Sequence, residues 1–243
     1  MTERLSDERL QKIEWFDKNY VDIKKRVEAA CKKRGRSADE VILLAATKTV
    51  PAEVINHAIE SGIAYIGENR VQEFLSKEEE LKTEAHRHFI GHLQTNKVKD
   101  IVGKVEMIQS VHSIKLATEI NKASQKLGIK TDILVEVNIG NEESKSGFAP
   151  AEVYEAVEQM AKMPFIKVNG LMTIPPICEK TEECVQYFDK MSKLFIDIRH
   201  KKVDNVSMEY LSMGMSDDFE LAIEYGANII RVGTALFGRR NYL

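Results

Sequence analysis

The 243-residue sequence has no long hydrophobic run and almost no net charge. No apolar stretch approaches the roughly 20 residues that a membrane-spanning helix needs. The formal net charge is -3, so no basic surplus draws the chain towards nucleic acid or an anionic membrane surface. The first ten residues lack the hydrophobic segment of a secretory signal. These absences predict a chain whose partners are neither nucleic acids nor membranes.

Cysteine is also scarce. Cys31, Cys178 and Cys184 are the three cysteines, an odd number with no Cys-x-x-Cys spacing. Neither a disulfide framework nor a metal site is therefore predicted, and we expect three small, buried or half-buried thiols. Thiols that stay reduced are typical of a reducing compartment, so the expected location is the cytoplasm.

The residues that are present favour an α/β barrel. The composition, 43% hydrophobic and 30% charged, is that of an ordinary globular protein. Short apolar runs predict strands at 41–47, 63–67, 87–91, 105–110, 131–138, 166–172, 206–211 and 228–232. Amphipathic patterns predict helices near 51–61, 69–82, 95–102, 113–127, 150–162, 181–201 and 216–225. Eight parallel strands alternating with helices in about 190 residues favour a closed (β/α)8 TIM barrel over an open sheet.

An extra helix is expected before the barrel. Apolar residues recur at three- and four-residue steps from residue 6 to residue 33. The chain ends about ten residues after the eighth predicted strand, which leaves little room for the usual last outer helix. We expect the N-terminal helix to take that place. Without repeats or a Gly/Ser/Pro-rich linker, residues 1–243 read as one domain, with 1–35 as a helical segment packed on the barrel.

Lys48 is the first candidate site residue. It ends the apolar run 41–46, and ligands of parallel barrels bind where the strands end. Burial of an ammonium lowers its pKa and makes the neutral amine available as a nucleophile towards a carbonyl, which is the setting of a Schiff-base lysine. A solvated strand end is the alternative for this residue taken alone. Polar residues follow most of the other predicted strands, and this gathering favours the functional interpretation.

Two glycine-containing segments, 211–216 and 231–238, follow the seventh and eighth predicted strands. Barrels often bind phosphate there, because small residues let backbone N–H groups and hydroxyls approach an anion. The candidate phosphate ligands are Ser212, Gly233 and Thr234, and strand alternation turns Arg231 to the same side as Gly233. An amine-reactive aldehyde and a bound phosphate together describe pyridoxal 5′-phosphate (PLP). An arginine at the pyridine nitrogen weakens PLP as an electron sink, which disfavours transamination.

Five segments in order resemble the signatures of the PLP homeostasis protein family (the YggS/PROSC type), and the resemblance extends over almost the whole chain. They are 45–49 (AATKT), 67–73 (GENRVQE), 88–97 (HFIGHLQTNK), 211–218 (LSMGMSDD) and 231–238 (RVGTALFG). The resemblance implies a barrel like the N-terminal domain of alanine racemase, with PLP held as a Schiff base on Lys48. It further implies a phosphate site at Ser212, Gly233 and Thr234, with Arg231 facing the pyridine nitrogen. Asn69 is expected close to the cofactor, and either His88 or His92 in the pocket.

The same resemblance raises the question of catalysis. Alanine racemase uses two bases, the Schiff-base lysine and a tyrosine from a second domain of the partner subunit. This chain ends soon after the barrel, and none of its tyrosines stands where it would be expected as an opposing base. We expect a monomer that stores PLP or delivers it to PLP-requiring apo-enzymes, with little or no catalysis. A single-domain PLP-dependent racemase is the alternative. A mere scaffold is disfavoured, since it has no reason to keep an amine and an anion site on one rim.

Overall fold

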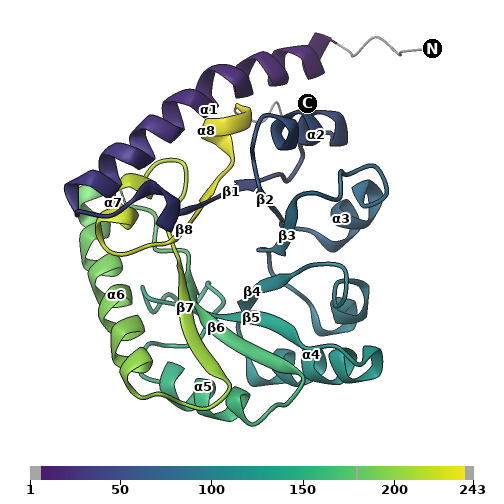
Figure 1. Ribbon diagram of the computed structural model, residues 1–243. Coiled ribbons are helices and arrows are strands. Elements are labelled where there is room, and N and C mark those ends of the chain that lie inside the picture. The colour runs from purple at the N-terminus through teal and green to yellow at the C-terminus, as the bar shows by residue number, and fades with distance from the viewer. Residues whose placement is uncertain (1–6, 179, 239–243) are drawn as a thin grey trace.

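The computed structural model describes residues 7–178 and 180–238. Eight parallel strands follow one another in chain order, and β1 pairs with β8 to close the barrel (Figure 1). The strands are Ile42–Ala46 (β1), Tyr65–Glu68 (β2), His86–Phe89 (β3), Met107–Val111 (β4), Thr131–Val137 (β5), Ile166–Thr173 (β6), Val206–Ser212 (β7) and Ile229–Val232 (β8). All eight predicted strands and the TIM-barrel class are confirmed.

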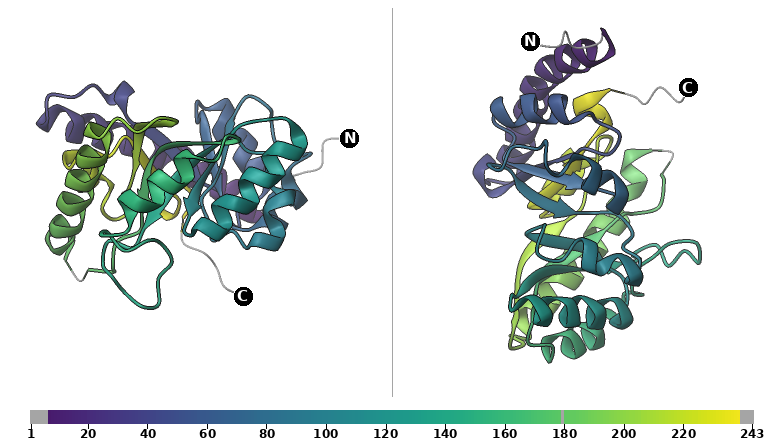
Figure 2. Two further views of the ribbon diagram at one scale, coloured as in Figure 1. Left: turned by 90° about the horizontal axis from the view of Figure 1, so that it is seen from below. Right: turned by 90° about the vertical axis from the view of Figure 1, so that its right-hand side faces the viewer.

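The helices lie outside the strands (Figures 1 and 2). The α-helices of the barrel are Ala52–Glu60 (α2), Val71–Lys77 (α3), Ile114–Leu127 (α4), Val153–Ala161 (α5), Val185–His200 (α6), Phe219–Glu224 (α7) and Thr234–Phe237 (α8). Short 3-10 helices are Ala38–Glu40 (η1), Thr95–Asp100 (η2) and Thr181–Cys184 (η3). The predicted helix at 95–102 is therefore a 3-10 helix, because its six residues bury only Val98 and offer no apolar face for an α-helix. Between β5 and α5 the chain projects from the barrel (Figure 2).

The expected extra helix is α1, Asp7–Lys33. It buries Phe16, Ile23 and Val27 and packs against α2, α7 and α8 (Figure 1). Because α8 has only four residues, α1 covers the outside of the barrel next to β8, as the sequence predicts. Residue 6 of the predicted helix lies outside the described residues.

The barrel interior has an apolar layer and a polar layer. Six side chains pack together inside the strands and form the apolar layer: Leu44, Ile90, Met107, Leu134, Met172 and Ile229. Buried polar side chains of β3, β4, β7 and β8 form the other layer: His88, Gln109, Ser212 and Arg231. The apolar layer fills the barrel, so ligands have access at the strand ends and not through a pore.

The expectation of three thiols is wrong for two of the cysteines. Cys178 and Cys184 form a disulfide within the segment that joins β6 to α6, while Cys31 is a buried free thiol. Their Cα atoms lie 6.1 Å apart, within the range that a disulfide spans. The two cysteines are six positions apart, and such a spacing alone does not predict a disulfide. Because two of the three cysteines are paired, the cysteines do not indicate a reducing compartment.

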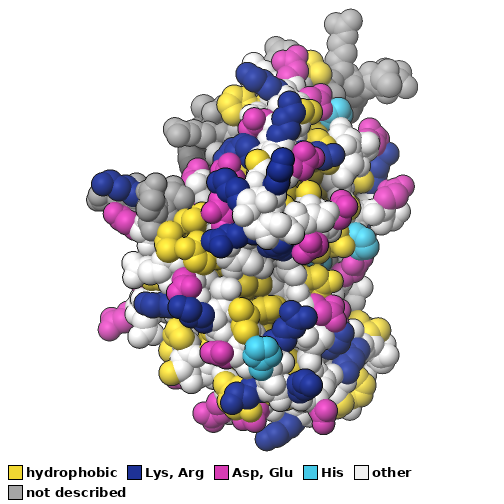
Figure 3. Space-filling model, turned by 60° about the vertical axis from the view of Figure 1, so that its left-hand side comes forward, with side chains coloured by type: hydrophobic (Ala, Val, Ile, Leu, Met, Phe, Trp, Pro, Cys, Tyr) yellow, Lys and Arg dark blue, Asp and Glu magenta, His cyan; other side chains and the backbone are white. Residues whose placement is uncertain are grey.

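The surface carries charges of both signs. Figure 3 shows Lys and Arg side chains intermixed with Asp and Glu on one face of the molecule. No helix in the described part of the chain has the length and hydropathy to cross a membrane.

Candidate functional site

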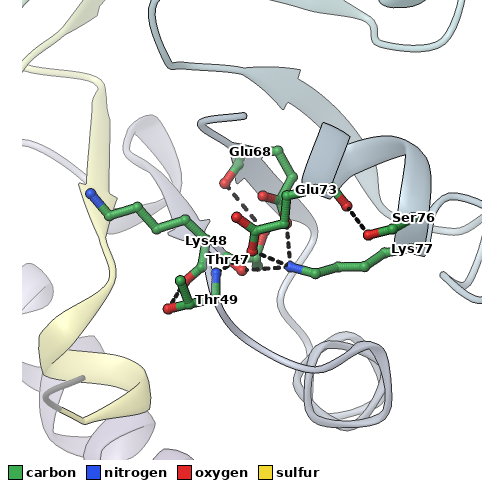
Figure 4. A network of polar contacts seen from close by, with 8 residues as sticks. Thr47, Lys48, Thr49, Glu68, Glu73, Ser76 and Lys77 are labelled. Carbon is green, nitrogen blue, oxygen red and sulfur yellow. Dashed lines mark hydrogen bonds and ion pairs between the residues drawn. The ribbon is translucent and has the colours of Figure 1, made fainter. Parts of the chain in front are cut away.

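Lys48 stands at the C-terminal end of β1, directly after the buried Thr47. It is half-buried, and its side chain extends towards the ribbon of β8 and α8 (Figure 4). There it lines a cavity of about 210 Å³. The first strand of the barrel thus delivers an amine to the end of the last strand.

Arg231, Gly233 and Thr234 line the same cavity from the β8 side. The N–H groups of Gly233 and Ala235, at the start of α8, donate to the Ser216 hydroxyl oxygen at 3.3 and 3.1 Å. This hydroxyl comes from the connection between β7 and α7. Closure of the barrel therefore brings the Lys48 amine, the Arg231 guanidinium, hydroxyls and backbone N–H groups to a single cavity.

Arg231 is buried and held from two sides. Its Nη1 donates to the Ser212 hydroxyl at 2.6 Å, and its Nη2 donates to the Thr173 carbonyl oxygen at 2.8 Å. Burial lowers the pKa of the guanidinium to about 10, while the carboxylates of Asp218 and Glu136 act in the opposite direction. Arg231 is therefore a fixed cation at neutral pH.

Ser212 and His88 are buried in the barrel interior. They are not among the described residues that line the cavity. The Ser212 hydroxyl donates to Gln109 Oε1 at 2.7 Å, and Gln109 Nε2 donates to His88 Nδ1 at 2.8 Å. Burial lowers the pKa of His88 to about 4, so its imidazole is neutral and can accept this bond. The sequence analysis missed Gln109, although a glutamine inside a buried strand is itself a signal.

Asn69 follows β2 and also lies outside the cavity lining. Its side-chain oxygen is buried and has no hydrogen-bond partner among the described residues. Its backbone carbonyl passes close to Gly91 at the end of β3, where an added Cβ would meet that oxygen at 2.0 Å. Only glycine at position 91 lets the ends of β2 and β3 approach in this way.

Lys12 and Ser216 are among the polar cavity residues that the sequence does not predict as ligands. Lys12 comes from α1 and is half-buried at the cavity. Neither residue was chosen as a ligand, because no local pattern shows which helix residue reaches the rim or where β7 ends. Their contribution is a product of tertiary packing.

A polar network lies behind Lys48, formed by Thr47, Glu68, Glu73 and Lys77 (Figure 4). Burial raises the pKa of the Glu68 carboxyl, although Lys77 and the Thr47 hydroxyl act against this rise. Among the described residues, this network included, no group of three or more His, Cys, Asp or Glu residues is placed to hold a metal ion.

Comparison with known proteins identifies the family. The sequence matches the family "Alanine racemase, N-terminal domain" over residues 26–241. The pyridoxal phosphate homeostasis protein of Aquifex aeolicus is 49% identical over 218 residues, which cover 89% of this chain and 95% of that protein. The chain belongs to the pyridoxal phosphate homeostasis protein family. The family member of the same name from Escherichia coli is 34% identical over 228 residues, 92% of this chain and 96% of that protein.

Solved structures agree with this family. A protein from Bifidobacterium adolescentis superposes with a TM-score of 0.89 at 36% identity, over 97% of this chain and 98% of that one. PipY of Synechococcus elongatus, solved with PLP bound, gives a TM-score of 0.76 at 30% identity, over 88% and 100%. An alanine racemase of Clostridium difficile shares the fold alone, with a TM-score of 0.71 at 15% identity over 92% of this chain and 57% of that one. The family resemblance found in the five sequence segments is thus confirmed.

Proposed function

We propose that this chain binds PLP in the cavity between the ends of β1 and β8, as a Schiff base on Lys48, and serves PLP homeostasis by storing or delivering the cofactor. The convergence of Lys48, Arg231, Gly233 and Thr234 on one cavity carries this proposal. Membership of the PLP homeostasis protein family and the PLP-bound PipY structure support it. Storage or delivery of PLP extends this proposal beyond PLP binding.

The donor set fits the cofactor. PLP supplies an aldehyde that forms a reversible covalent bond with an amine and a ring that withdraws electrons. Lys48 would provide the amine, while the N–H groups and hydroxyls around Ser216, Gly233 and Thr234 would hold the phosphate. Arg231 would face the pyridine nitrogen. As a cation at neutral pH it takes no proton from that nitrogen and gives none readily, so the ring stays a weak electron sink.

Carrier and enzyme differ in the need for a second base. Two-base racemisation needs an acid and a base on opposite faces of the ring. Among the described residues no tyrosine lines the cavity, where Asp217 is the one carboxylate. This supports a carrier over the alternative, a single-domain PLP-dependent amino-acid racemase. A measurable conversion of L-alanine to D-alanine by the purified protein would favour the racemase.

The wider proposals follow from the carrier role. The barrel and its N-terminal helical segment, residues 1–35, would act as one PLP-binding domain over 1–243. Its recipients would be PLP-requiring apo-enzymes, and a protein that supplies them has to share their compartment, so we propose the cytoplasm. Lys48, Arg231, Gly233 and Thr234 of one chain supply an amine, a guanidinium and phosphate donors, and we propose that the protein binds PLP as a monomer.

The first test is the visible spectrum of the protein with PLP, before and after borohydride reduction, with mass mapping of the reduced peptide. We expect a yellow band that reduction fixes on Lys48. Lys48→Ala should lose the reducible adduct and keep weaker PLP binding through the phosphate contacts. A reducible adduct that persists in Lys48→Ala would disprove the assignment of the amine.

A further inference from the structure

Both chain neighbours of Lys48 are tied to side chains of β2 and α3. The buried Thr47 hydroxyl donates to Glu68 Oε1 at 2.7 Å, and the Thr49 N–H donates to the Glu73 carboxylate. The ammonium of Lys77 joins the two acids, at 3.2 Å from Glu68 Oε1 and 2.7 Å from Glu73 Oε1. It also donates to the Thr47 carbonyl oxygen at 3.2 Å. The backbone on each side of Lys48 is therefore held by one ion-pair network (Figure 4).

Thr49 explains why this backbone needs to be held. Its φ is +62°, a left-handed conformation that a β-branched residue rarely adopts. Such a conformation persists only where the surroundings impose it. The bond from the Thr49 N–H to Glu73 is one such constraint, and the bond from the Val50 N–H to the Thr47 carbonyl oxygen, at 3.0 Å, is another. Together they fix the turn from which the Lys48 side chain departs.

The network is sheltered from water. The exposed fractions of the side chains are 2% for Glu68, 12% for Lys77 and 17% for Glu73. Charges this sheltered depend on one another, because removal of one partner leaves the other buried and uncompensated. None of the three residues lines the cavity among the described residues. They act on a ligand through Lys48 and through the turn at Thr49 and Val50, which also lines the cavity.

We propose that Glu68, Glu73 and Lys77 are positioning residues that aim the Lys48 amine at the ligand aldehyde. This inference rests on the proposed function. In the reaction, the neutral amine nitrogen adds to the aldehyde carbon, a C=N bond replaces the C=O bond, and the oxygen leaves with the two amine protons as water. Nothing is oxidised or reduced. Positioning of the amine changes the rate of this condensation and leaves the phosphate contacts intact.

Lys77→Met tests the proposal, since methionine keeps most of the side-chain volume and removes the charge. Two readouts separate positioning from binding: the rate at which the imine band grows with PLP, and the affinity for pyridoxine 5′-phosphate, which has an alcohol where PLP has the aldehyde. We expect imine formation to slow by about tenfold or more and the pyridoxine 5′-phosphate affinity to change less than about twofold. Lys193→Met, at a 71% exposed lysine of α6, is the matched control. Equal imine rates in Lys77→Met and wild type would overturn the proposal.

A second pair of variants keeps the test decisive if Lys77→Met fails to fold. Glu73→Gln retains an acceptor for the Thr49 N–H, whereas Glu73→Ala loses it, so imine formation should be slower in Glu73→Ala. Adding Thr49→Asn to Glu73→Ala should restore part of the rate, because asparagine adopts the left-handed conformation more readily than threonine. A double variant as slow as Glu73→Ala would contradict the role assigned to this turn.

Apo-protein gives a readout that does not depend on PLP. Acetylation of Lys48 by limiting acetic anhydride, mapped by mass spectrometry, should change in Lys77→Met relative to Lys193, which serves as an internal standard. If wild type forms no imine at all, the proposed function fails. If wild type forms it and Lys77→Met forms it at the same rate, only the positioning proposal fails.

Discussion

Two serines four residues apart, Ser212 and Ser216, have different surroundings. The Ser212 hydroxyl is fully buried between Arg231 and Gln109, whereas the Ser216 hydroxyl meets the N–H groups at the start of α8 on the cavity. We therefore expect the proposed phosphate contact from Ser216. The Ser212 hydroxyl accepts a hydrogen bond from Arg231 and so holds it in place.

Ser216→Ala should lower the affinity for PLP by about tenfold, which corresponds to about 1.5 kcal/mol for one hydrogen bond to a charged group. The affinity for pyridoxal, which has no phosphate, should stay close to that of wild type. Fluorescence or absorbance titration with each ligand measures both values. Ser61→Ala, at an exposed serine, is the control. Equal losses for PLP and pyridoxal would place Ser216 away from the phosphate.

Sequence alone could predict that Lys48 and Arg231 meet at the cavity, but not which neighbouring side chains face it. Lys48 and Arg231 come together because a closed barrel joins its first and last strands. Ser212 was expected on the phosphate because β7 was expected to end at residue 211. The strand continues through Ser212, so that side chain still points into the barrel. The local sequence pattern does not show where this strand ends, so it does not show which way the Ser212 side chain points.

Helix α1 also contributes a residue to the site. The segment that matches the family begins at residue 26, so the first two thirds of α1 lie outside it. This part buries Phe16 against the barrel and brings Lys12 to the cavity. An ammonium at this position adds positive charge next to the proposed phosphate site.

Lys12→Met should lower PLP affinity by about fivefold, in line with about 1 kcal/mol for a half-exposed charge pair. The loss should shrink at high salt, since ions screen such a contact. Titrations at low and high ionic strength measure it, with Lys18→Met, at an exposed lysine of the same helix, as control. Identical affinities for Lys12→Met and Lys18→Met at low salt would remove Lys12 from the site.

The sequence predicted the strands and helices well and the contacts between them poorly. Alternating periodicities determined eight strands and the extra helix, because a barrel strand and an amphipathic helix each leave a local pattern. The Cys178–Cys184 pair and the reach of Lys12 leave none. Both depend on how a loop or a helix packs, which is decided by contacts distant in sequence.

Glu136 and His88, both buried in the barrel, have opposite effects on how the stability of the whole molecule depends on pH. Burial raises the pKa of Glu136 from 4.5 to about 7, and lowers that of His88 from 6.5 to about 4. Between pH 4.5 and 7 the folded state binds more protons at Glu136 than the unfolded state, so the free energy of unfolding falls as pH rises. Between pH 4 and 6.5 the unfolded state binds more protons at His88, so the free energy rises. The two contributions oppose each other between pH 4.5 and 6.5.

Glu136→Gln should uncover this opposition. The difference in free energy of unfolding between this variant and wild type should grow by about 3 kcal/mol between pH 4.5 and 7 and then level off. The size follows because a pKa shift of one unit is worth about 1.4 kcal/mol. The gain arises because glutamine has no carboxylate to ionise in the barrel, where Glu136 Oε2 has no hydrogen-bond partner among the described residues. Urea unfolding at pH 4.5, 6 and 7.5 measures the difference. A difference that stays flat across these pH values would mean that the Glu136 carboxylate is solvated or paired in the folded protein, and the polar layer of the barrel would then hold more water than its packing implies.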